Sequence, residues 1–290
     1  MTERPHTPVM VSEVMAGLEL EANKWYVDAT FGAGGHTRAF LEQGANVFAI
    51  DQDETTQQYA SKIREGLKEH RMEDFILKQG NFRHLDNYVK EAGVSPVAGI
   101  FMDLGVSSMQ LDEAERGFAF RQDGPLDMRM SAEGTSAADV VNHYSQEDLA
   151  SIIFKYGEER FSRRIARAIV DARPLHTTGD LVAVIQKAYP GGKRKDHPAR
   201  RTFQALRIYV NDELAALEDT LKASLNVLAI GARLVVLSYH SLEDRIVKHF
   251  IRSEAQLENK TKKPLTATEQ ECQENPRARS AKLRIAERLA

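Results

Sequence analysis

The chain has 290 residues, and 42% of them are hydrophobic, so it is long enough to bury a sizeable core in one domain with an insertion or in two domains. Its single cysteine, Cys272, excludes an internal disulfide and the cysteine-bound cluster of a radical iron–sulfur enzyme. The polar, acidic sequence around Cys272 also argues against an activated thiolate, which methylation of a pyrimidine ring carbon usually requires.

The net charge of -3 conceals an asymmetry along the chain. Residues 1–150 contain 13 Lys+Arg and 25 Asp+Glu, whereas residues 151–290 contain 26 and 17. The basic second half predicts a polyanionic partner, although two solvated faces with a chance imbalance are the alternative. The first residues form no apolar signal core, and no run of about eighteen apolar residues occurs. We therefore expect a cytoplasmic protein without a membrane partner.

The first third of the chain alternates between strand and helix patterns. Short buried strands are predicted at 25–30, 46–50, 75–79 and 97–103, with helical spacing between them at 36–43, 54–70 and 82–92. This alternation predicts an α/β fold, with a parallel sheet and right-handed crossovers. Ligands of such sheets bind at the carboxyl ends of the strands. Polar residues stand at all four ends: Asp28, Asp51, Asn81 and Asp103.

A glycine-rich loop, DATFGAGGH at 28–36, follows the first strand. Its glycines allow close approach of the backbone to a ligand, and Asp51 stands where an α/β nucleotide site keeps the acid that holds ribose hydroxyls. The loop lacks the third glycine of a dinucleotide site, which favours S-adenosylmethionine and disfavours a nicotinamide-dependent oxidoreductase. We expect His36 or Thr37 to open the next helix, with loop amides facing the methionyl carboxylate. A simple tight turn is the alternative.

Two further strand ends carry candidate site residues. Phe82 is positioned to stack on adenine, or else it is a core phenylalanine beside a helix-capping Asn81. Asp103 ends the fourth strand, where the methyl group meets its acceptor in S-adenosylmethionine enzymes. Its carboxylate is suited either to accept a hydrogen bond from a base amine or to contact the cofactor. The Asp/Asn-Pro-Pro-aromatic motif of many amino-methyltransferases is absent.

The pattern changes after residue 111 and returns near residue 207. Helical spacing predominates at 137–143, 146–156, 159–172 and 178–188. A helix at 211–228 then leads through a turn at Gly231 into a strand at 233–238, so 112–206 is predicted to be an insertion. We also expect a helix at 241–252 opened by a capping box of Ser241 and Asp244, loop at 254–280, and a final edge strand at 282–288.

Basic residues are concentrated in the second half. One predicted helix face carries Arg160, Arg163, Arg164 and Arg167, and a second patch comprises Lys193, Arg194, Lys195, Arg200 and Arg201. Several such clusters, with aromatic residues between them, favour a surface that binds a phosphate backbone over helix faces that are merely solvated. RNA is favoured over duplex DNA as the partner. The histidines show no metal-ligand spacing, so no metal is expected.

Several sequence blocks resemble the RsmH (MraW) family, the bacterial 16S rRNA (cytosine-N4)-methyltransferases. They are HTPV (6–9), DATFGAGGH (28–36), DLGVSS (103–108), ERGF (115–118), GPLDMRM (124–130), YGEER (156–160), HPARRTF (197–203), SLEDR (241–245) and NPRARS (275–280). The resemblance implies methylation by S-adenosylmethionine of N4 of one cytidine in the decoding centre (P site) of 16S rRNA. It also implies a class I (Rossmann-like) methyltransferase core, 1–111 and 207–290, with an inserted helical substrate-recognition domain, 112–206.

The resemblance further implies the roles of individual residues. Cofactor contacts would come from Gly34, Gly35 and His36 in the loop, Asp51 at the ribose, Phe82 at the adenine, and Asp103 with Gln110 at the methionine end. The partner would be 16S rRNA or the small ribosomal subunit, and the protein a monomer or homodimer. Two alternatives remain: methylation of another base amine or of a small molecule, and a non-catalytic rRNA-binding assembly factor.

Overall fold

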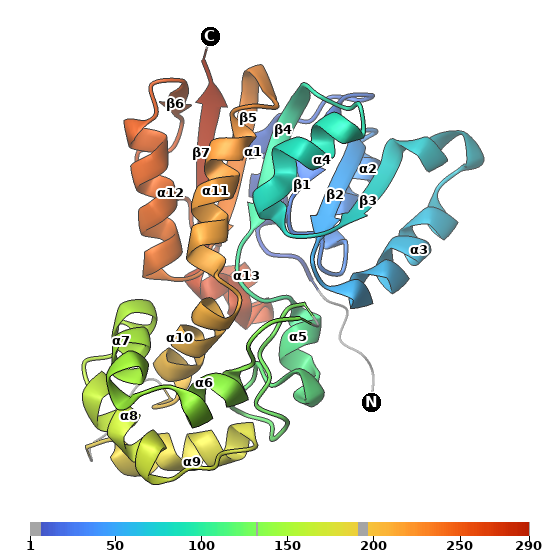
Figure 1. Cartoon of the computed structure of the whole chain (residues 1–290). Coiled ribbons are helices and arrows are strands. Elements are labelled where there is room, and N and C mark those ends of the chain that lie inside the picture. The colour runs from blue at the N-terminus through green and yellow to red at the C-terminus, as the bar shows by residue number, and fades with distance from the viewer. Residues whose placement is uncertain (1–6, 132, 191–196, 290) are drawn as a thin grey trace. The chain divides into compact units, whose positions relative to one another are not determined.

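A computed structural model of the chain describes residues 7–131, 133–190 and 197–289. The chain forms two compact units, one of Met1–Gly105 with Leu214–Ala290 and the other of Val106–Glu213 (Figure 1). The insertion expected from the sequence covers 112–206. Its assignment as a substrate-recognition domain stays a prediction.

The first unit contains a seven-stranded sheet in the order β3-β2-β1-β4-β5-β7-β6. The strands β1 to β5 pair in parallel, and β7 runs antiparallel to β5 and β6. The order reverses beside β1, which places the switch point of an α/β sheet between β1 and β4. The predicted α/β, Rossmann-like fold is confirmed. The strand bounds are β1 Trp25–Asp28, β2 Asn46–Asp51, β3 Phe75–Gln79, β4 Val97–Asp103, β5 Leu228–Ser238, β6 Leu257–Asn259 and β7 Lys282–Arg288.

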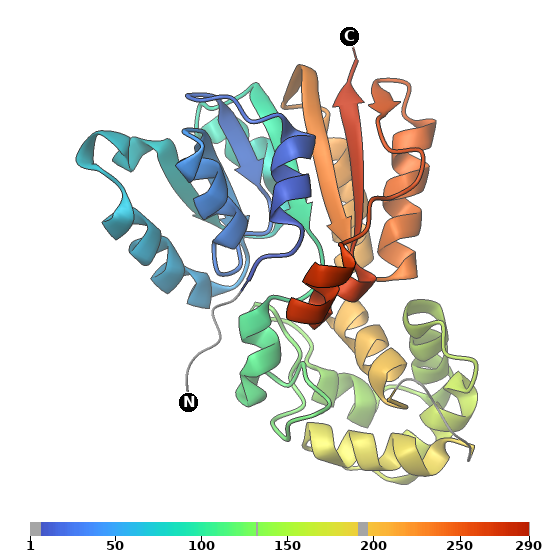
Figure 2. The ribbon, with the colours of Figure 1, turned by 180° about the vertical axis from the view of Figure 1, so that it is seen from behind.

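Helices cover both faces of this sheet (Figures 1 and 2). One face packs against α4 (Leu85–Glu91), α11 (Glu213–Ser224) and α12 (Ser241–Ser253), and the other against α1 (Val11–Leu18), α2 (Gly35–Glu42) and α3 (Gln57–Gly66). Successive strand residues point to opposite faces. Tyr26 therefore enters one core and Val27 the other, and both are at most 1% exposed. Burial on two faces explains why β1, β2 and β4 are nearly continuous apolar runs.

The C-terminal part of the first unit departs from three expectations. The strand at 282–288 exists, but it is not an edge strand, because β6 pairs on its outer side. The region 254–280 is not all loop, since it contains β6, α13 (Glu269–Glu274) and a 3₁₀ turn at Pro276–Ser280. The helix expected at 211–228 ends at Ser224, and β5 begins at Leu228 with Gly231 inside the strand at φ +79°.

The second unit is helical. It consists of α5 (Ser108–Asp112), α6 (Ala137–His143), α7 (Gln146–Gly157), α8 (Ser162–Asp171), α9 (Thr178–Ala188) and α10 (Arg200–Val210) around one apolar core. Side chains of Ser136, Ser145 and Thr177 cap the first backbone amides of α6, α7 and α9, which explains the sharp helix starts. Across the described parts of both units, every helix is too short or too polar to cross a membrane.

Candidate active site

The candidate site of the first unit lies at the carboxyl ends of its central strands. Asp28 ends β1, Asp51 ends β2 and Asp103 ends β4, while Tyr239 directly follows β5. In the register of the sheet, Asp28 pairs with Phe101 of β4, and Asp103 pairs with Leu237 of β5. The parallel arrangement therefore brings these polar groups to one edge of the sheet.

The glycine loop ends at Gly34, the N-cap of α2 with φ +75°. A Cβ at Gly34 would lie 2.6 Å from Ile63 and 2.9 Å from Phe31, so the position needs glycine for space as well as for backbone conformation. The expectation that His36 or Thr37 opens the helix is wrong, because α2 begins at Gly35. Glycine has no side chain to cap the first amides of α2, which leaves the helix N-terminus suited to an anion.

Asp28 is a buried structural acid, only 1% exposed. Its two carboxylate oxygens accept hydrogen bonds from the Thr37 hydroxyl at 2.7 Å and the Thr30 amide at 3.2 Å. Burial raises the pKa of Asp28, and the neighbouring His36 and the two hydrogen bonds oppose that shift. Asp28 therefore ties the end of β1 to the first turn of α2 and fixes the shape of the glycine loop.

Asp51 has both carboxylate oxygens bonded to backbone amides. Oδ2 accepts from the Gly32 amide at 2.7 Å and Oδ1 from the Asp53 amide at 2.9 Å. Burial raises the pKa of Asp51 to about 6, against the effect of these two hydrogen bonds. Each carboxylate oxygen has a second lone pair, so the group remains able to accept from two hydroxyl groups. A ribose with adjacent hydroxyls matches that acceptor pair.

Asp103 is held by residues that closely follow the two neighbouring strands, β1 and β5. Its amide donates to the Thr30 hydroxyl at 2.6 Å, and the Tyr239 hydroxyl donates to its Oδ1 at 2.6 Å. Burial raises the pKa of Asp103 to about 7, the Tyr239 hydrogen bond works against this, and the charge of Glu243 adds to it. The carboxyl group of Asp103 thus changes its protonation near neutral pH, which is the range in which an enzyme acid or base works.

His36 lies in the first turn of α2 and is 6% exposed. Its Nε2 is 2.9 Å from the Val9 carbonyl oxygen, and its Nδ1 is 3.8 Å from Asp103 Oδ2. Burial lowers the pKa of His36, although the charge of Asp28 partly opposes this. A neutral ring that donates through Nε2 to Val9 keeps its Nδ1 lone pair on the side of Asp103.

The residues after β3 have the capping and packing roles that the sequence offered as the alternative to a contact with adenine. Asn81 caps the short 3₁₀ turn Phe82–His84 by accepting from the Arg83 amide at 3.1 Å. Its side-chain amide also donates to Gln52 at 3.1 Å, beside the end of β2. Phe82 is half-buried and packs against the core. Contact between Phe82 and adenine stays a prediction.

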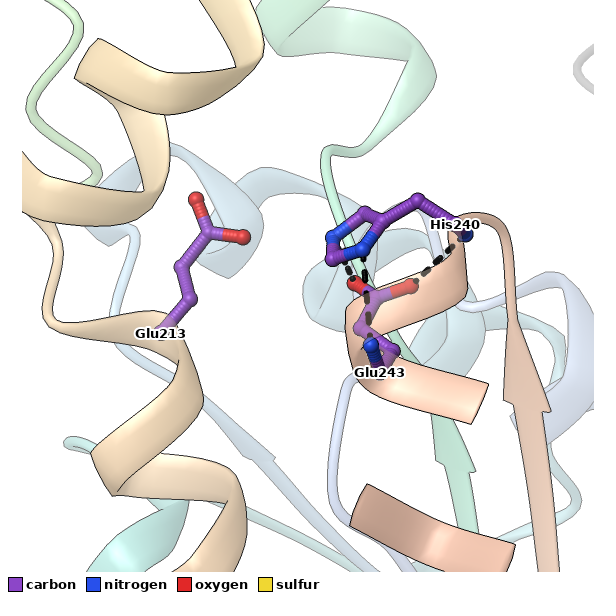
Figure 3. Close-up of side chains that lie close together, drawn as sticks. All are labelled: Glu213, His240 and Glu243. Atoms are coloured by element: carbon purple, nitrogen blue, oxygen red, sulfur yellow. Dashed lines mark hydrogen bonds and ion pairs between the residues drawn. The ribbon is translucent and has the colours of Figure 1, made fainter. Parts of the chain in front are cut away.

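A feature that sequence reasoning missed is the turn from β5 into α12. Glu243 is 3% exposed, and its Oε2 accepts from the backbone amides of Tyr239 at 2.9 Å and His240 at 3.2 Å. His240 Nε2 lies 3.0 Å from Glu243 Oε1. Figure 3 shows these two side chains together at the start of α12. The expected capping box of Ser241 and Asp244 is therefore wrong, because the box consists of His240 and Glu243.

Asp244, which is not part of the capping box, has a structural role. It binds Arg284 at 2.6 Å and Lys282 at 3.1 Å, which fastens α12 to β7. The sequence favours Ser241 as the N-cap because serine is common at that position. Histidine takes the position instead, so the box lies one residue earlier in the chain.

The remaining predicted site residues belong to the second unit. Gln110 is 5% exposed and forms a capping box with Ser107. Its contact with the methionine end of the cofactor stays a prediction. The helix expected at 159–172 begins only at Ser162, and Arg160 precedes it. Of the basic residues predicted to bind RNA, those that the structure describes are exposed: Arg160, Arg163, Arg164, Arg167, Arg200 and Arg201. Lys193, Arg194 and Lys195 lie outside the described residues.

Comparison with known proteins adds a consistent result over the whole chain. The model of the MraW methylase family matches residues 3–289. The ribosomal RNA small subunit methyltransferase H of Deinococcus deserti is 52% identical over 287 residues, which cover 98% of this chain and 93% of that protein. The proteins of the same name from Deinococcus radiodurans and Paramagnetospirillum magneticum are 51% and 45% identical, covering 98% and 100% of this chain and 90% and 98% of theirs. The chain therefore belongs to the MraW methylase family.

Proposed function

We propose that this chain methylates N4 of one cytidine in the decoding centre (P site) of 16S rRNA. As a member of the MraW methylase family, it is an S-adenosylmethionine-dependent methyltransferase, and small-subunit rRNA is its substrate. The observation that supports a base amine as the acceptor is the grouping of a glycine-capped helix start, Asp51 and Asp103 at the carboxyl ends of neighbouring strands.

The residues at this edge fit S-adenosylmethionine. Asp51 offers paired acceptors to the ribose hydroxyls, and Phe82 offers an aromatic face to the adenine. Gly34, Gly35 and His36 place backbone amides at the start of α2, which suits the methionyl carboxylate. Gln110 and Asp103 are assigned to the methionine end, where the methyl group of the cofactor meets the acceptor amine.

When bound, the cofactor supplies an electrophilic methyl group on a sulfonium. The protein supplies orientation, which can lower a barrier by up to about 7–11 kcal/mol. Asp103 is the residue we assign to the acceptor amine. An ionised carboxylate accepts a hydrogen bond from the exocyclic amino group, which directs the nitrogen lone pair out of the ring system, and takes the proton that the nitrogen releases.

The base must leave its stack to reach such a site, at a cost of a few kcal/mol. Phosphate contacts by Arg160, Arg163, Arg164, Arg167, Arg200 and Arg201 are proposed to offset this cost. Lys193, Arg194 and Lys195 are included in the same proposal on sequence grounds.

The test is transfer of a labelled methyl group from S-adenosylmethionine to small-subunit rRNA, followed by mass spectrometry of nucleosides and of rRNA fragments. We expect N4-methylcytidine at one position in the decoding centre. A label on an adenine amine would replace the proposed acceptor. Absence of label in rRNA, with intact cofactor binding, would favour a non-catalytic assembly factor.

A further inference from the structure

The turn between α7 and α8 is held in place by side chains of the second unit. Glu158 adopts a left-handed conformation with φ 48°, and its carbonyl oxygen accepts from Arg201 Nη1 at 2.7 Å. The carboxylate of Glu159 is 1% exposed and accepts hydrogen bonds from the Phe161 amide and the Tyr189 hydroxyl. These contacts order the turn in advance, and they bring Arg201 of α10 beside it.

Exposed arginines line this turn and the start of α8, beside one exposed acid, Glu158. Arg160 on the turn and Arg163 and Arg164 in the first turn of α8 are exposed. Farther along α8, Arg167 is paired with Asp171 at 3.7 Å, both side chains being mostly exposed. Among the described residues, Arg163 and Arg164 have no acidic partner. Their charge is therefore available to an anionic partner.

An exposed aromatic side chain lies near this turn. Phe154 is 63% exposed near the end of α7, one helical turn before Glu158, which is also exposed. Lys155 is the next residue, and its Nζ lies 4.8 Å from the centroid of the Tyr156 ring. The other large apolar side chains exposed in the described residues are aliphatic: Met72, Ile230, Leu265 and Leu289. An exposed ring one helical turn away from a turn that carries exposed arginines is a combination suited to single-stranded nucleic acid.

We propose that Phe154 stacks on an unpaired base of the substrate RNA, while Arg160 and Arg201 contact the phosphates on either side. This inference rests on the proposed function, since it takes RNA to be the substrate, and adds that the RNA is unpaired where it meets α7. A base presents a flat face to the ring, and the phosphates on either side carry the charge opposite to that of the Arg160 and Arg201 guanidinium groups.

The experiment measures binding of the full chain to small-subunit rRNA fragments that contain either an unpaired loop or a fully paired stem. We expect Phe154→Ala to weaken binding of the loop fragment about tenfold and to leave binding of the stem unchanged. Phe154→Leu, which keeps an apolar side chain but removes the ring, should lose as much as Phe154→Ala. Ile230→Ala, at a position 74% exposed in the other unit, is the matched control and should bind like the wild type.

A Phe154→Trp variant gives a direct readout of stacking. Its fluorescence should be quenched by the loop fragment, whereas the wild type, whose single tryptophan is Trp25, should show no such change. Unchanged binding by Phe154→Ala, or an equal loss on stem and loop, overturns the inference, as does self-association that only Phe154→Ala abolishes. Methyl transfer by the wild type is measured separately, so that failure of the proposed function is distinguished from failure of the stacking contact.

Discussion

Replacement of Asp103 by asparagine is expected to stabilise the free protein while abolishing methyl transfer. In the folded chain the pKa of Asp103 is raised from 3.8 to about 7, chiefly by burial. Between these two pH values the folded state holds a proton that the unfolded state has released. Stability therefore falls as the pH rises through this window, and the loss is complete above about pH 7.

The magnitude follows from the size of the shift. Three pKa units at 1.36 kcal/mol each correspond to about 4 kcal/mol of lost stability at pH 8, and about 2 kcal/mol at pH 5. The side chain of Asp103 is 25% exposed, which makes these upper figures. Asparagine carries no charge, and its carbonyl oxygen can still accept from Tyr239, so Asp103→Asn should recover most of this loss.

The assay is urea unfolding of both proteins without cofactor at pH 5 and pH 8. The stabilisation by Asp103→Asn should be larger at pH 8. The control is Asp86→Asn in the same unit: burial of Asp86 is outweighed by hydrogen bonds from Asn226 and Lys90, which lower its pKa, so that variant should lose stability at pH 8. A stability difference for Asp103→Asn that is independent of pH, or of opposite sign, would refute the reasoning.

Three further predictions concern the site and the basic surface. Asp51→Ala should weaken S-adenosylmethionine binding at least tenfold, because it removes the acceptors for both ribose hydroxyls and leaves two backbone amides without a partner. Calorimetry measures this affinity, and an unchanged value would contradict the ribose assignment. Tyr239→Phe removes a hydrogen bond that lowers the pKa of Asp103, so the rising limb of the pH–rate profile should move to higher pH, and an unmoved profile would argue against Asp103 as the base. Reversal of charge at Arg163 and Arg167 should weaken rRNA binding at low salt more than at high salt and spare cofactor binding, whereas equal rRNA affinity would mean that this helix face is only solvated.

The sequence by itself determined the α/β core and the position of the candidate site. The apolar runs that form β1, β2 and β4 are buried on both faces, whereas β3, at the edge of the sheet, is mostly half-buried. Each of the four ends in a polar residue, so the strands and their ends are predictable from the sequence. Strand β4 was predicted with its observed bounds, Val97–Asp103. The glycine loop was equally legible, because few residues other than glycine adopt φ +75° at Gly34.

Other features were decided only by the tertiary structure. Whether the segment at 282–288 is an edge strand depends on the pairing partner β6, which is short and polar and has no pattern of its own. The raised pKa of Asp103 depends on burial and on Tyr239 and Glu243, both more than 130 residues away along the chain. The exposure of Phe154 depends on which side of α7 packs against α8 and α10. Local sequence fixes the conformation of a segment, but burial and charge at a point are sums over neighbours that only the folded chain brings together.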